Sequence, residues 1–590
     1  MPLPFEDSRR LTGANLYFTE PGAVLETLPD DSIDDAFIAM WRERVEFARN
    51  TLQWPLDAPT AVRVHASGAA FAIAAPIDQL FTATEVNEWA FLLAQHRVSG
   101  RDRDELFFAP AYPAIWDEDL ALRTMRLAAT GERRIDLTAL LDAAHSNDLP
   151  FQLDDTELTL GAGSGARTWP LDALPAVDSI DWTTLHGIPV ALVTGSNGKT
   201  TTTRLVAAMS ELHGMRTAFS CTDGVFVDGH PVASGDYSGP AGARTALRQP
   251  LAEAAILETA RGGILRRGLA VNRADAAIVT NISADHFGEY GIRDLDGLAD
   301  TKLVVARALA AQGMLVLNAD DETLVRRAAT LSCKLAWFAL DAEHPLLVAH
   351  RARRGATCSV RDGQLILHRD GNDYALGRIA NMPLTMRGAA TYNITNIAGA
   401  ALLASALNIP VQTIASVLAH FGSDNADNPG RLMRWSFGTS TVLVDYAHNP
   451  EGLHGLLDVA RATAPGSRLA LVLGQAGNRE DADIRKLAAT AASFRPALIV
   501  LKDIESHLRG RAPGETAAIL KDELFRNGIA QTSITTCLDE VEAARTALRW
   551  AHDGDCIVLP IHDKQARAQV VGLLDQLATD QWLPGRPLSG

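Results

Sequence analysis

Residues 188–203 read IPVALVTGSNGKTTTT, and this stretch decides the fold of the central part of the chain. A short apolar run ends in a glycine turn, and Lys199 and four threonines follow at once. This order predicts a buried strand, a phosphate-binding loop and the start of a helix. The backbone N–H groups of such a loop hold a polyphosphate, with the helix dipole behind them. The helix is expected to continue to Gly214, because apolar residues recur at helical spacing at Leu205, Val206, Met209 and Leu212.

The loop predicts nucleotide binding, with Lys199 reaching the terminal phosphates and Thr200 holding Mg²⁺. The general motif has a glycine six residues before the lysine, and Val193 stands there instead, so this loop is short. A glycine-rich turn without a ligand is the alternative, but the order of strand, Lys-Thr and helix favours the nucleotide. The predicted nucleotide-binding residues of this segment are Gly195, Asn197, Gly198, Lys199, Thr200 and Thr201.

Composition limits the class of protein. A chain of 590 residues is too long for one core, so three or four domains are expected. The net charge of −17 argues against a nucleic-acid partner, which requires a basic surface. The five cysteines lack metal-ligand spacing and indicate buried residues in a reducing compartment. No signal region and no apolar run of the ~20 residues that span a bilayer are evident, so a cytoplasmic protein is expected.

Periodicity divides the chain into four parts. Residues 1–153 are expected to form an α+β domain, and 154–184, rich in Gly, Pro, Asp and Thr, a linker. Residues 185–427 are expected to form a doubly wound, ATP-binding α/β domain of the P-loop type, because short buried strands alternate with helices. Residues 428–590 repeat that alternation and predict a Rossmann-like α/β domain.

The C-terminal domain is predicted in most detail. The expected strands are Thr441–Asp445, Arg468–Gly474, Ala497–Lys502 and Cys556–Pro560. The expected helices are Pro450–Thr463, Glu480–Ser493, Gly514–Asn527 and Glu540–Ala551. The hinge between the two α/β domains is expected at Asp424–Arg431.

Polar residues after strand ends are the further candidates for chemistry. Glu258 ends an apolar strand and can share the Mg²⁺ with the loop threonine, although an exposed strand-end glutamate is the alternative. His286 follows another strand, where a structural histidine is the alternative. Lys302 lies on a helix, where sequence alone favours a surface lysine. Arg431 and His448 lie near the hinge, where a surface arginine and a helix-capping group are the alternatives.

The chain resembles the Mur ligase family, because six motifs follow one another in the order found in that family. They are TGSNGKTT, NISADH, NADD, TYNITN, NPGR and VDYAHNP. Residues 180–590 more narrowly resemble the C-terminal, Mur-ligase-like half of the cyanophycin synthetases, through TDGVFVDG, SGDYSGPAGAR, LETARGGILRRGL, GNRED and LRGRAPGE.

The resemblance implies a mechanism. An ATP γ-phosphoryl group passes to a carboxylate, and an amine attacks the resulting acyl phosphate. By position, Lys199, Glu258, His286 and Lys302 are the implied catalytic residues, and Thr200, Glu258, His286 and Lys302 the implied metal-site residues. Lys302 matches a lysine that is carbamylated in many members. The implied nucleotide-contacting residues outside the loop are Asn393, Arg431, Asp445 and His448.

The sequence departs from the family in two respects. Tyr392 stands where many members have a histidine before the adenine-contacting asparagine. Cyanophycin synthetases also carry an N-terminal domain and an ATP-grasp ligase before the Mur-like half. The approximately 185 residues that precede the phosphate loop here are too few for both. A separate ATP-grasp ligase is therefore a possible partner.

The prediction is an ATP- and Mg²⁺-dependent carboxylate–amine ligase that joins an amino acid to an aspartyl-type or peptide carboxylate. The alternative is a non-catalytic homologue that binds a polymer or a partner protein. A homo-oligomer is also possible, since relatives of this kind often assemble.

Overall fold

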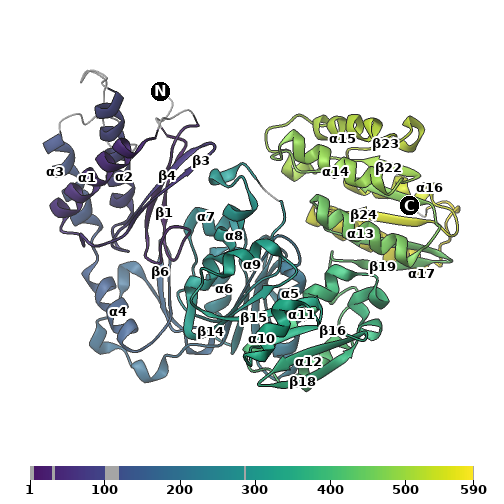
Figure 1. The fold of residues 1–590 in the computed structure, drawn as a ribbon, viewed down its shortest axis with the longest axis horizontal. Helices are drawn as coiled ribbons and strands as arrows, with labels where there is room; N and C mark the ends of the chain where they lie inside the picture. Colours follow the sequence, from purple (N-terminus) through teal and green to yellow (C-terminus); the bar gives the residue numbers. More distant parts are fainter. Residues whose placement is uncertain (1–4, 30–32, 100–117, 285–286, 589–590) are drawn as a thin grey trace.

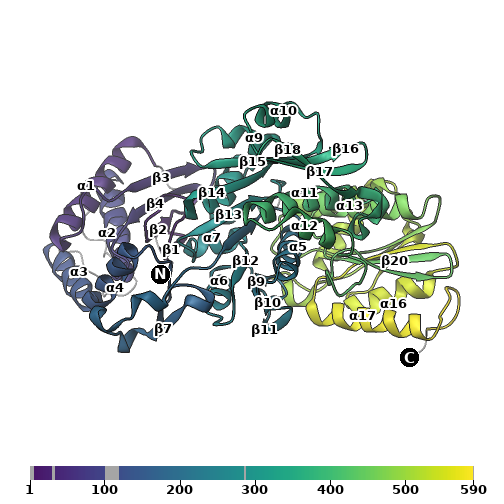
Figure 2. The ribbon, with the colours of Figure 1, turned by 90° about the horizontal axis from the view of Figure 1, so that it is seen from below.

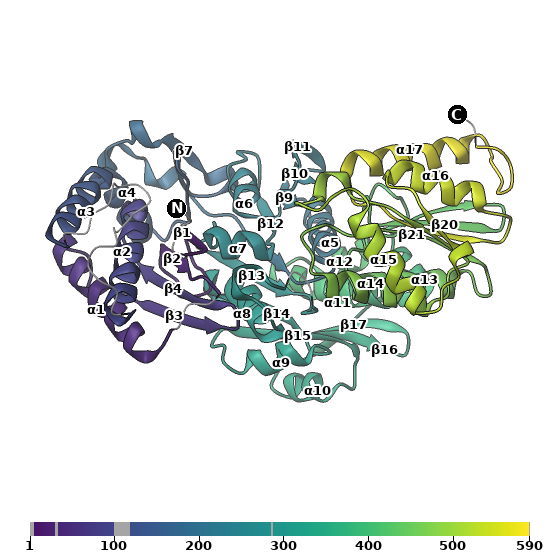
Figure 3. The ribbon, with the colours of Figure 1, turned by 90° about the horizontal axis from the view of Figure 1, so that it is seen from above.

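The computed structural model describes residues 5–29, 33–99, 118–284 and 287–588. It has three main domains, and the central one lies between the N-terminal and the C-terminal domain (Figure 1). The views from below and from above show the same order (Figures 2 and 3). Among the described helices, none is both long enough and apolar enough to cross a membrane.

The N-terminal domain is an antiparallel sheet, in the order β1-β2-β4-β3, packed against helices. Residues 60–74 fold as a hairpin of two antiparallel strands, β3 and β4. The domain docks through buried polar groups, because the Arg9 guanidinium donates to the Leu265 carbonyl at 2.9 Å and pairs with Glu26. Its elements are β1 Asp7–Leu11, β2 Gly22–Glu26, α1 Asp35–Leu52, β3 Thr60–His65, β4 Gly68–Ala74, α2 Leu80–Ser99, α3 Glu118–Glu132 and α4 Ile135–Ser146.

The stretch expected as a linker, 154–184, is folded. With β5 (Phe151–Leu153) it forms a three-stranded antiparallel sheet through β6 (Glu157–Leu160) and β7 (Arg167–Pro170). Leu158 and Leu160 are fully buried against α4, so a small hydrophobic core holds the segment. Its turn-forming composition concealed these short strands, because each contributes only a few apolar residues.

The central domain is built on an eleven-stranded sheet in the order β11-β10-β9-β12-β8-β13-β14-β15-β16-β17-β18. The seven strands from β9 to β16 run parallel, and an antiparallel hairpin extends each edge. The strands are β8 Val190–Thr194, β9 Thr217–Cys221, β10 Gly224–Val227, β11 His230–Ser234, β12 Ala254–Glu258, β13 Ala274–Val279, β14 Leu309–Asn318, β15 Lys334–Asp341, β16 Thr357–Arg361, β17 Gln364–Arg369 and β18 Asn372–Arg378.

Helices cover both faces of this sheet, which confirms the doubly wound α/β class. Along β8, Leu192 packs into the core on one face, and Ala191 and Val193 pack into the core on the other. Such two-sided burial is typical of parallel sheets. The helices are α5 Lys199–Leu212, α6 Pro240–Leu247, α7 Arg261–Arg267, α8 Leu295–Leu303, α9 Glu322–Ala328, α10 Pro345–Ala352, α11 Thr391–Ala406 and α12 Val411–Leu418.

The C-terminal domain is a second α/β unit with the strand order β19-β20-β24-β21-β22-β23, parallel except for β19. Its strands are β19 Met433–Phe437, β20 Ser440–Asp445, β21 Leu469–Leu473, β22 Leu498–Leu501, β23 Ile534–Thr536 and β24 Cys556–Pro560. Its helices are α13 Pro450–Thr463, α14 Asp481–Ser493, α15 Glu515–Arg526, α16 Glu540–Trp550 and α17 Lys564–Thr579. Every strand and helix that the sequence predicts for the C-terminal domain is present, and β19, β23 and α17 are additional.

Candidate active site

The phosphate-binding loop joins β8 to α5, and two glycines make it possible. Gly195 has φ +146°, and a Cβ there would lie 1.8 Å from Thr280 Oγ1. Gly198 has φ +82°, and a Cβ there would lie 2.0 Å from Asn396 Oδ1. Both the backbone conformation and the close neighbours therefore require glycine. Val193 is a buried strand residue paired with Glu258 and Ile278, so the loop starts after the position where a longer motif has its first glycine.

A buried hydroxyl and a buried carboxylate meet at the start of α5. Thr200 Oγ1 donates to Glu258 Oε2 at 2.8 Å and lies 2.9 Å from Thr222 Oγ1. Glu258 is 1 % exposed. Burial raises the pKa of Glu258, while Lys199, Thr200 and Arg431 favour its ionised form. Lys199 Nζ donates to the Ser196 carbonyl at 3.0 Å, at the mouth of the loop.

These groups fit a magnesium ion. Mg²⁺ prefers oxygen ligands and is usually held by one or two protein groups together with phosphates and water. The Thr200 hydroxyl and the Glu258 carboxylate provide such oxygens beside the phosphate-binding loop. Among the described residues no group of three His, Cys, Asp or Glu side chains could hold a metal by itself. A metal here would therefore depend on the phosphates, and it would neutralise their charge.

Lys302 is not a surface lysine. It lies on α8, is 4 % exposed, and its Nζ donates to the Gly195 carbonyl at 2.8 Å. A helix from outside the loop thus holds the first turn of the loop. His286 lies outside the described residues.

The C-terminal domain contributes a second set of groups. Arg431 donates to Thr200 Oγ1 and Thr222 Oγ1, both at 3.3 Å, and its guanidinium lies over the Tyr446 ring at 4.4 Å. Asp445 Oδ2 accepts from the Leu432 N–H at 2.7 Å. Burial raises the pKa of Asp445, while Arg431 and backbone N–H groups favour its charge. His448 Nδ1 lies 3.1 Å from the Tyr446 carbonyl.

Direct hydrogen bonds join the C-terminal domain to the phosphate-binding loop. Asn449 Nδ2 donates to Asn197 Oδ1 at 2.9 Å, and Asn197 Nδ2 donates to Glu451 Oε2 at 2.9 Å. Asn428, in the hinge, donates to Thr201 Oγ1 at 3.1 Å. The two domains are therefore close together in this structure, with the loop at their contact.

Asp223 forms a second interdomain contact, which we call the Asp223 clasp. Its carboxylate accepts from Arg567 of α17 at 2.7 Å and from Arg204 of α5 at 3.3 Å. Lys564 donates to the Asp223 carbonyl at 2.9 Å. Burial opposes the charge of Asp223, but Arg431, Arg567 and Arg204 together lower its pKa.

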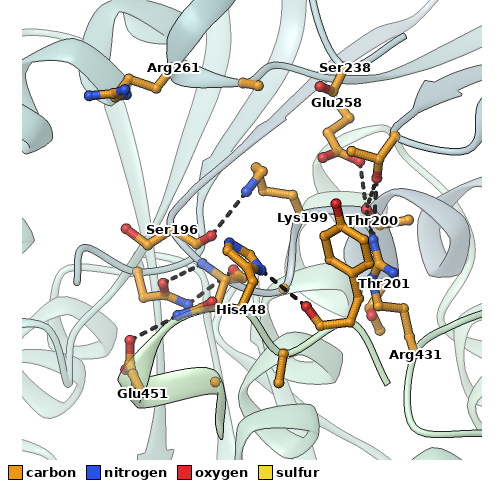
Figure 4. A pocket seen from close by; sticks show the side chains of 18 of the residues that line it. Ser196, Lys199, Thr200, Thr201, Ser238, Glu258, Arg261, Arg431, His448 and Glu451 are labelled. Carbon is orange, nitrogen blue, oxygen red and sulfur yellow. Dashed lines mark hydrogen bonds between the residues drawn. The ribbon is translucent and has the colours of Figure 1, made fainter. Parts of the chain in front are cut away.

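One cavity of about 1000 Å³ lies between these elements. Figure 4 shows Lys199, Thr200 and Glu258 facing it from the central domain, and Arg431, His448 and Glu451 from the C-terminal domain. Asn393 also lines it, with one amide hydrogen donated to the Leu384 carbonyl and Oδ1 accepting from Asn396. The predicted residues that line the cavity are Asn197, Gly198, Lys199, Thr200, Thr201, Glu258, Lys302, Asn393, Arg431, Asp445 and His448.

The sequence reasoning missed several residues of the site. Thr222 and Asp223 belong to the quoted segment TDGVFVDG, but no role followed from their spacing. Asn449 follows His448 and precedes a helix, which is a typical capping position. Tyr446 belongs to the quoted motif VDYAHNP, but no role followed from its position. Arg567 carried no signal, because its contact with Asp223 crosses between domains.

Two family models match the chain. The Mur ligase middle domain matches residues 193–404, and the Mur ligase, glutamate ligase domain, matches residues 430–560. Together they cover more than half of the chain. Cyanophycin synthetase from Nostoc sp. (strain PCC 7120 / SAG 25.82 / UTEX 2576) is 35% identical over 378 residues, which are 63% of this chain and 41% of that protein. The chain thus spans about two fifths of the length of this curated relative.

A further relative is the UDP-N-acetylmuramoyl-L-alanyl-D-glutamate--2,6-diaminopimelate ligase of Xanthomonas campestris pv. campestris (strain 8004). It is 28% identical and covers 66% of this chain and 76% of its own length. The solved structure of E. coli FolC in complex with DHPP and ADP has a TM-score of 0.47 at 19% identity, covering 66% of this chain and 89% of that chain. Because the two Mur ligase domain models together match more than half of the chain, the chain belongs to the Mur ligase family.

Proposed function

We propose that the protein is an ADP-forming carboxylate–amine ligase that makes an amide or isopeptide bond through an acyl phosphate. Membership of the Mur ligase family and the similarity to cyanophycin synthetases support an ATP-dependent amide ligase. The acyl-phosphate route and the residue roles are our proposal.

The observation that carries the proposal is the meeting of two domains at one phosphate-binding loop. Lys199, Thr200 and Glu258 approach from the central domain, and Arg431 and His448 approach from the C-terminal domain. Phosphoryl transfer depends mainly on positioning and charge neutralisation. A site closed by two domains also excludes water from a reactive acyl phosphate.

The proposed reaction has two steps. A carboxylate oxygen attacks the γ-phosphorus of ATP, the bond to the β-phosphate oxygen breaks, and ADP leaves. An uncharged amine then attacks the acyl carbon, and the tetrahedral intermediate expels phosphate and loses a proton to give the amide. Lys199 and the loop N–H groups hold the phosphates. Thr200 and Glu258 would hold Mg²⁺, which neutralises phosphate charge when bound.

The remaining assignments are proposals of the same kind. Lys302 and His286 support the metal site, with Lys302 as a carbamate, and Asn393 contacts the adenine. The acid is an aspartyl-type or peptide carboxylate, the amine is an amino acid, and a separate ATP-grasp ligase supplies the acid. Robust ligation of two free amino acids by the purified chain alone would argue against that dependence.

The test is a screen for phosphate released from ATP. Acidic peptides are paired with each amino acid, and products are identified by mass. We expect an amide product with one ADP per bond, and its loss in Lys199→Ala. Lys334→Ala, an exposed lysine at the start of β15, is the control and should retain activity. An unchanged rate in Lys199→Ala would contradict the mechanism, and no product with any pair would favour the non-catalytic homologue.

A further inference from the structure

A row of arginines extends the cavity away from the phosphate-binding loop. α7 begins three residues after Glu258, and its apolar residues, Ile264 and Leu265, are buried in the core. The other residues of α7 line the cavity, and they are Arg261, Gly262, Gly263, Arg266 and Arg267. One face of this helix is therefore a wall of the cavity that starts near the proposed metal ligand.

The length of α7 sets a distance along this wall. An α-helix rises about 1.5 Å per residue, so Arg266 and Arg267 lie about 8–9 Å further along the axis than Arg261. An extended peptide advances about 3.3–3.6 Å per residue. The interval therefore corresponds to two or three residues of an extended peptide.

Two guanidinium groups lie at the far end of the wall, and the Tyr290 hydroxyl and the charges of Glu289 and Asp7 raise the pKa of Arg266. Arg266 Nε donates to the Tyr290 hydroxyl at 3.1 Å, and Arg267 donates to the Arg10 carbonyl at 3.4 Å. Within the described part of the chain, neither guanidinium has an ion pair with a carboxylate. Glu289, next to Tyr290 in the chain, is paired with Arg261 instead.

Arg244 of α6 adds a third cation to this end of the cavity. Its only described carboxylate partner is Asp154, at 3.7 Å, and Asp154 is shared with Arg248 at 2.7 Å. Burial lowers the pKa of Arg244, and the neighbouring Arg248 and Arg267 lower it further against the opposing effects of Asp154 and Asp155. A bound anion would relieve this repulsion.

The wall is open at Gly262 but not at Gly263, where a Cβ would lie 2.6 Å from Pro240 Cδ. A Cβ placed on Gly262 would meet no atom within 4 Å. A chain can therefore pass over Gly262 between the phosphate-binding loop and the three arginines.

We propose that Arg244, Arg266 and Arg267 bind an anionic group of the acid substrate two or three residues away from the carboxylate that reacts. The acid is then an acidic peptide and not a single amino acid. This inference rests on the proposed ligase function and adds a substrate class and a second contact point to it.

The first test is direct binding, with tetra-L-aspartate as the probe and aspartate as the short comparison. Isothermal titration calorimetry of the full chain with Mg²⁺ and ADP should show tetra-aspartate binding at least tenfold more tightly than aspartate. The double variant Arg266→Gln/Arg267→Gln should lose that tenfold difference. Arg526→Gln, an exposed arginine on α15, is the matched control and should stay within twofold of wild type. Equal binding of both probes, absent binding of tetra-aspartate, or equal affinity in the double variant would overturn the inference.

The second test blocks the path without changing charge. Gly262→Leu has space for its side chain and replaces a helical glycine with a stronger helix former, so the fold should be retained. It should weaken tetra-aspartate binding at least tenfold and leave ADP affinity unchanged. Gly572→Leu, an exposed helical glycine of α17 that also has no neighbour within 4 Å, is the control. Unchanged tetra-aspartate binding in Gly262→Leu would exclude this path.

The two proposals can fail separately. Tetra-aspartate binding that depends on Arg266 and Arg267, without phosphate release from any acid, would reject the ligase and keep the arginine site. Phosphate release and amide formation with aspartate and tetra-aspartate at equal kcat/KM, unchanged in the double variant, would keep the ligase and reject the site.

Discussion

Asn449 donates a hydrogen bond from Nδ2 to Asn197 Oδ1, 2.9 Å away, and so joins the residue before α13 to the phosphate-binding loop. The same Asn449 caps α13, because its Oδ1 accepts from the Gly452 N–H at 2.8 Å. One amide group thus fixes the start of a helix and the contact between two domains. The position of the C-terminal domain therefore depends on the conformation of the loop.

Asn449→Ser should separate these two roles. Serine is also a favoured N-cap residue, so thermal stability should change little. The shorter side chain cannot reach Asn197, and a lost hydrogen bond costs about 0.5–1.5 kcal/mol. We expect ADP binding to weaken about two- to tenfold, measured by calorimetry. A large fall in Tm would show that the cap, and not the domain contact, was lost.

Glu258→Gln should stabilise the protein without nucleotide and reduce its stabilisation by Mg²⁺ and ADP. Burial raises the pKa of Glu258 in the folded state, so its ionised form opposes folding above that pKa. The contribution of Glu258 to the free energy of unfolding of the wild type should therefore fall as pH rises. The fall should begin near the pKa of Glu258 in the unfolded state and end above its raised pKa in the folded state. Removing the charge should add stability at neutral pH, in the usual range of about 0.5–2 kcal/mol for stabilising substitutions.

Thermal unfolding of both proteins, with and without Mg²⁺ and ADP, checks this. The Tm of Glu258→Gln should be higher than wild type without ligand, and its increase with Mg²⁺ and ADP should be smaller. An equal ligand-induced increase would show that Glu258 does not hold the metal.

Stability should fall in acid because of His562. This buried histidine lies 3.0 Å from Lys502 Nζ, and burial, reinforced by Lys502, lowers its pKa to about 4. The unfolded imidazole, with a pKa of about 6.5, gains a proton first as pH falls. Stability should therefore be lost between pH 6.5 and 4, at up to about 1.4 kcal/mol per pH unit.

His562→Gln should remove this dependence. The decrease in unfolding free energy between pH 7 and 5, measured by urea denaturation, should shrink by about 2 kcal/mol. His420→Gln, on the exposed surface, is the control and should keep the wild-type slope. Equal slopes in all three proteins would place the acid sensitivity elsewhere.

Lys302→Arg tests the carbamate. Arginine can still donate to the Gly195 carbonyl, as Lys302 Nζ does in this structure, but it does not form the carbamate proposed for lysine. We expect ADP binding to remain within about threefold of wild type, the size of one weakened hydrogen bond. Amide formation should be lost. A fully active Lys302→Arg enzyme would mean that the cation alone suffices.

Much of the fold could be predicted because its signals are local. The four expected strands of the C-terminal domain appear within one residue of their predicted ends, since buried parallel strands read as continuous apolar runs. The edge strands β19 and β23 were not predicted, since one alternates in burial and the other is three residues long. Leu212 belongs to the helical pattern of α5 but is 58 % exposed, because the pattern extends past the packed part of the helix.

The site was predictable where motif order carries information and not where contacts cross between domains. Lys199, Thr200 and Glu258 meet because the carboxyl ends of neighbouring parallel strands share one edge of the sheet. Lys302 looked like a surface lysine, because helix spacing does not show which neighbouring loop covers it. The partnership of Asp223 with Arg567 links residues 344 positions apart, and no local pattern predicts it.

The Asp223 clasp has a consequence for domain opening. Any motion that separates the two α/β domains must move Arg567 away from Asp223. Arg204 belongs to the same domain as Asp223 and would stay beside it. An unpaired buried carboxylate is costly, but this one would retain a partner. Arg204 therefore reduces the free-energy cost of separating the two domains.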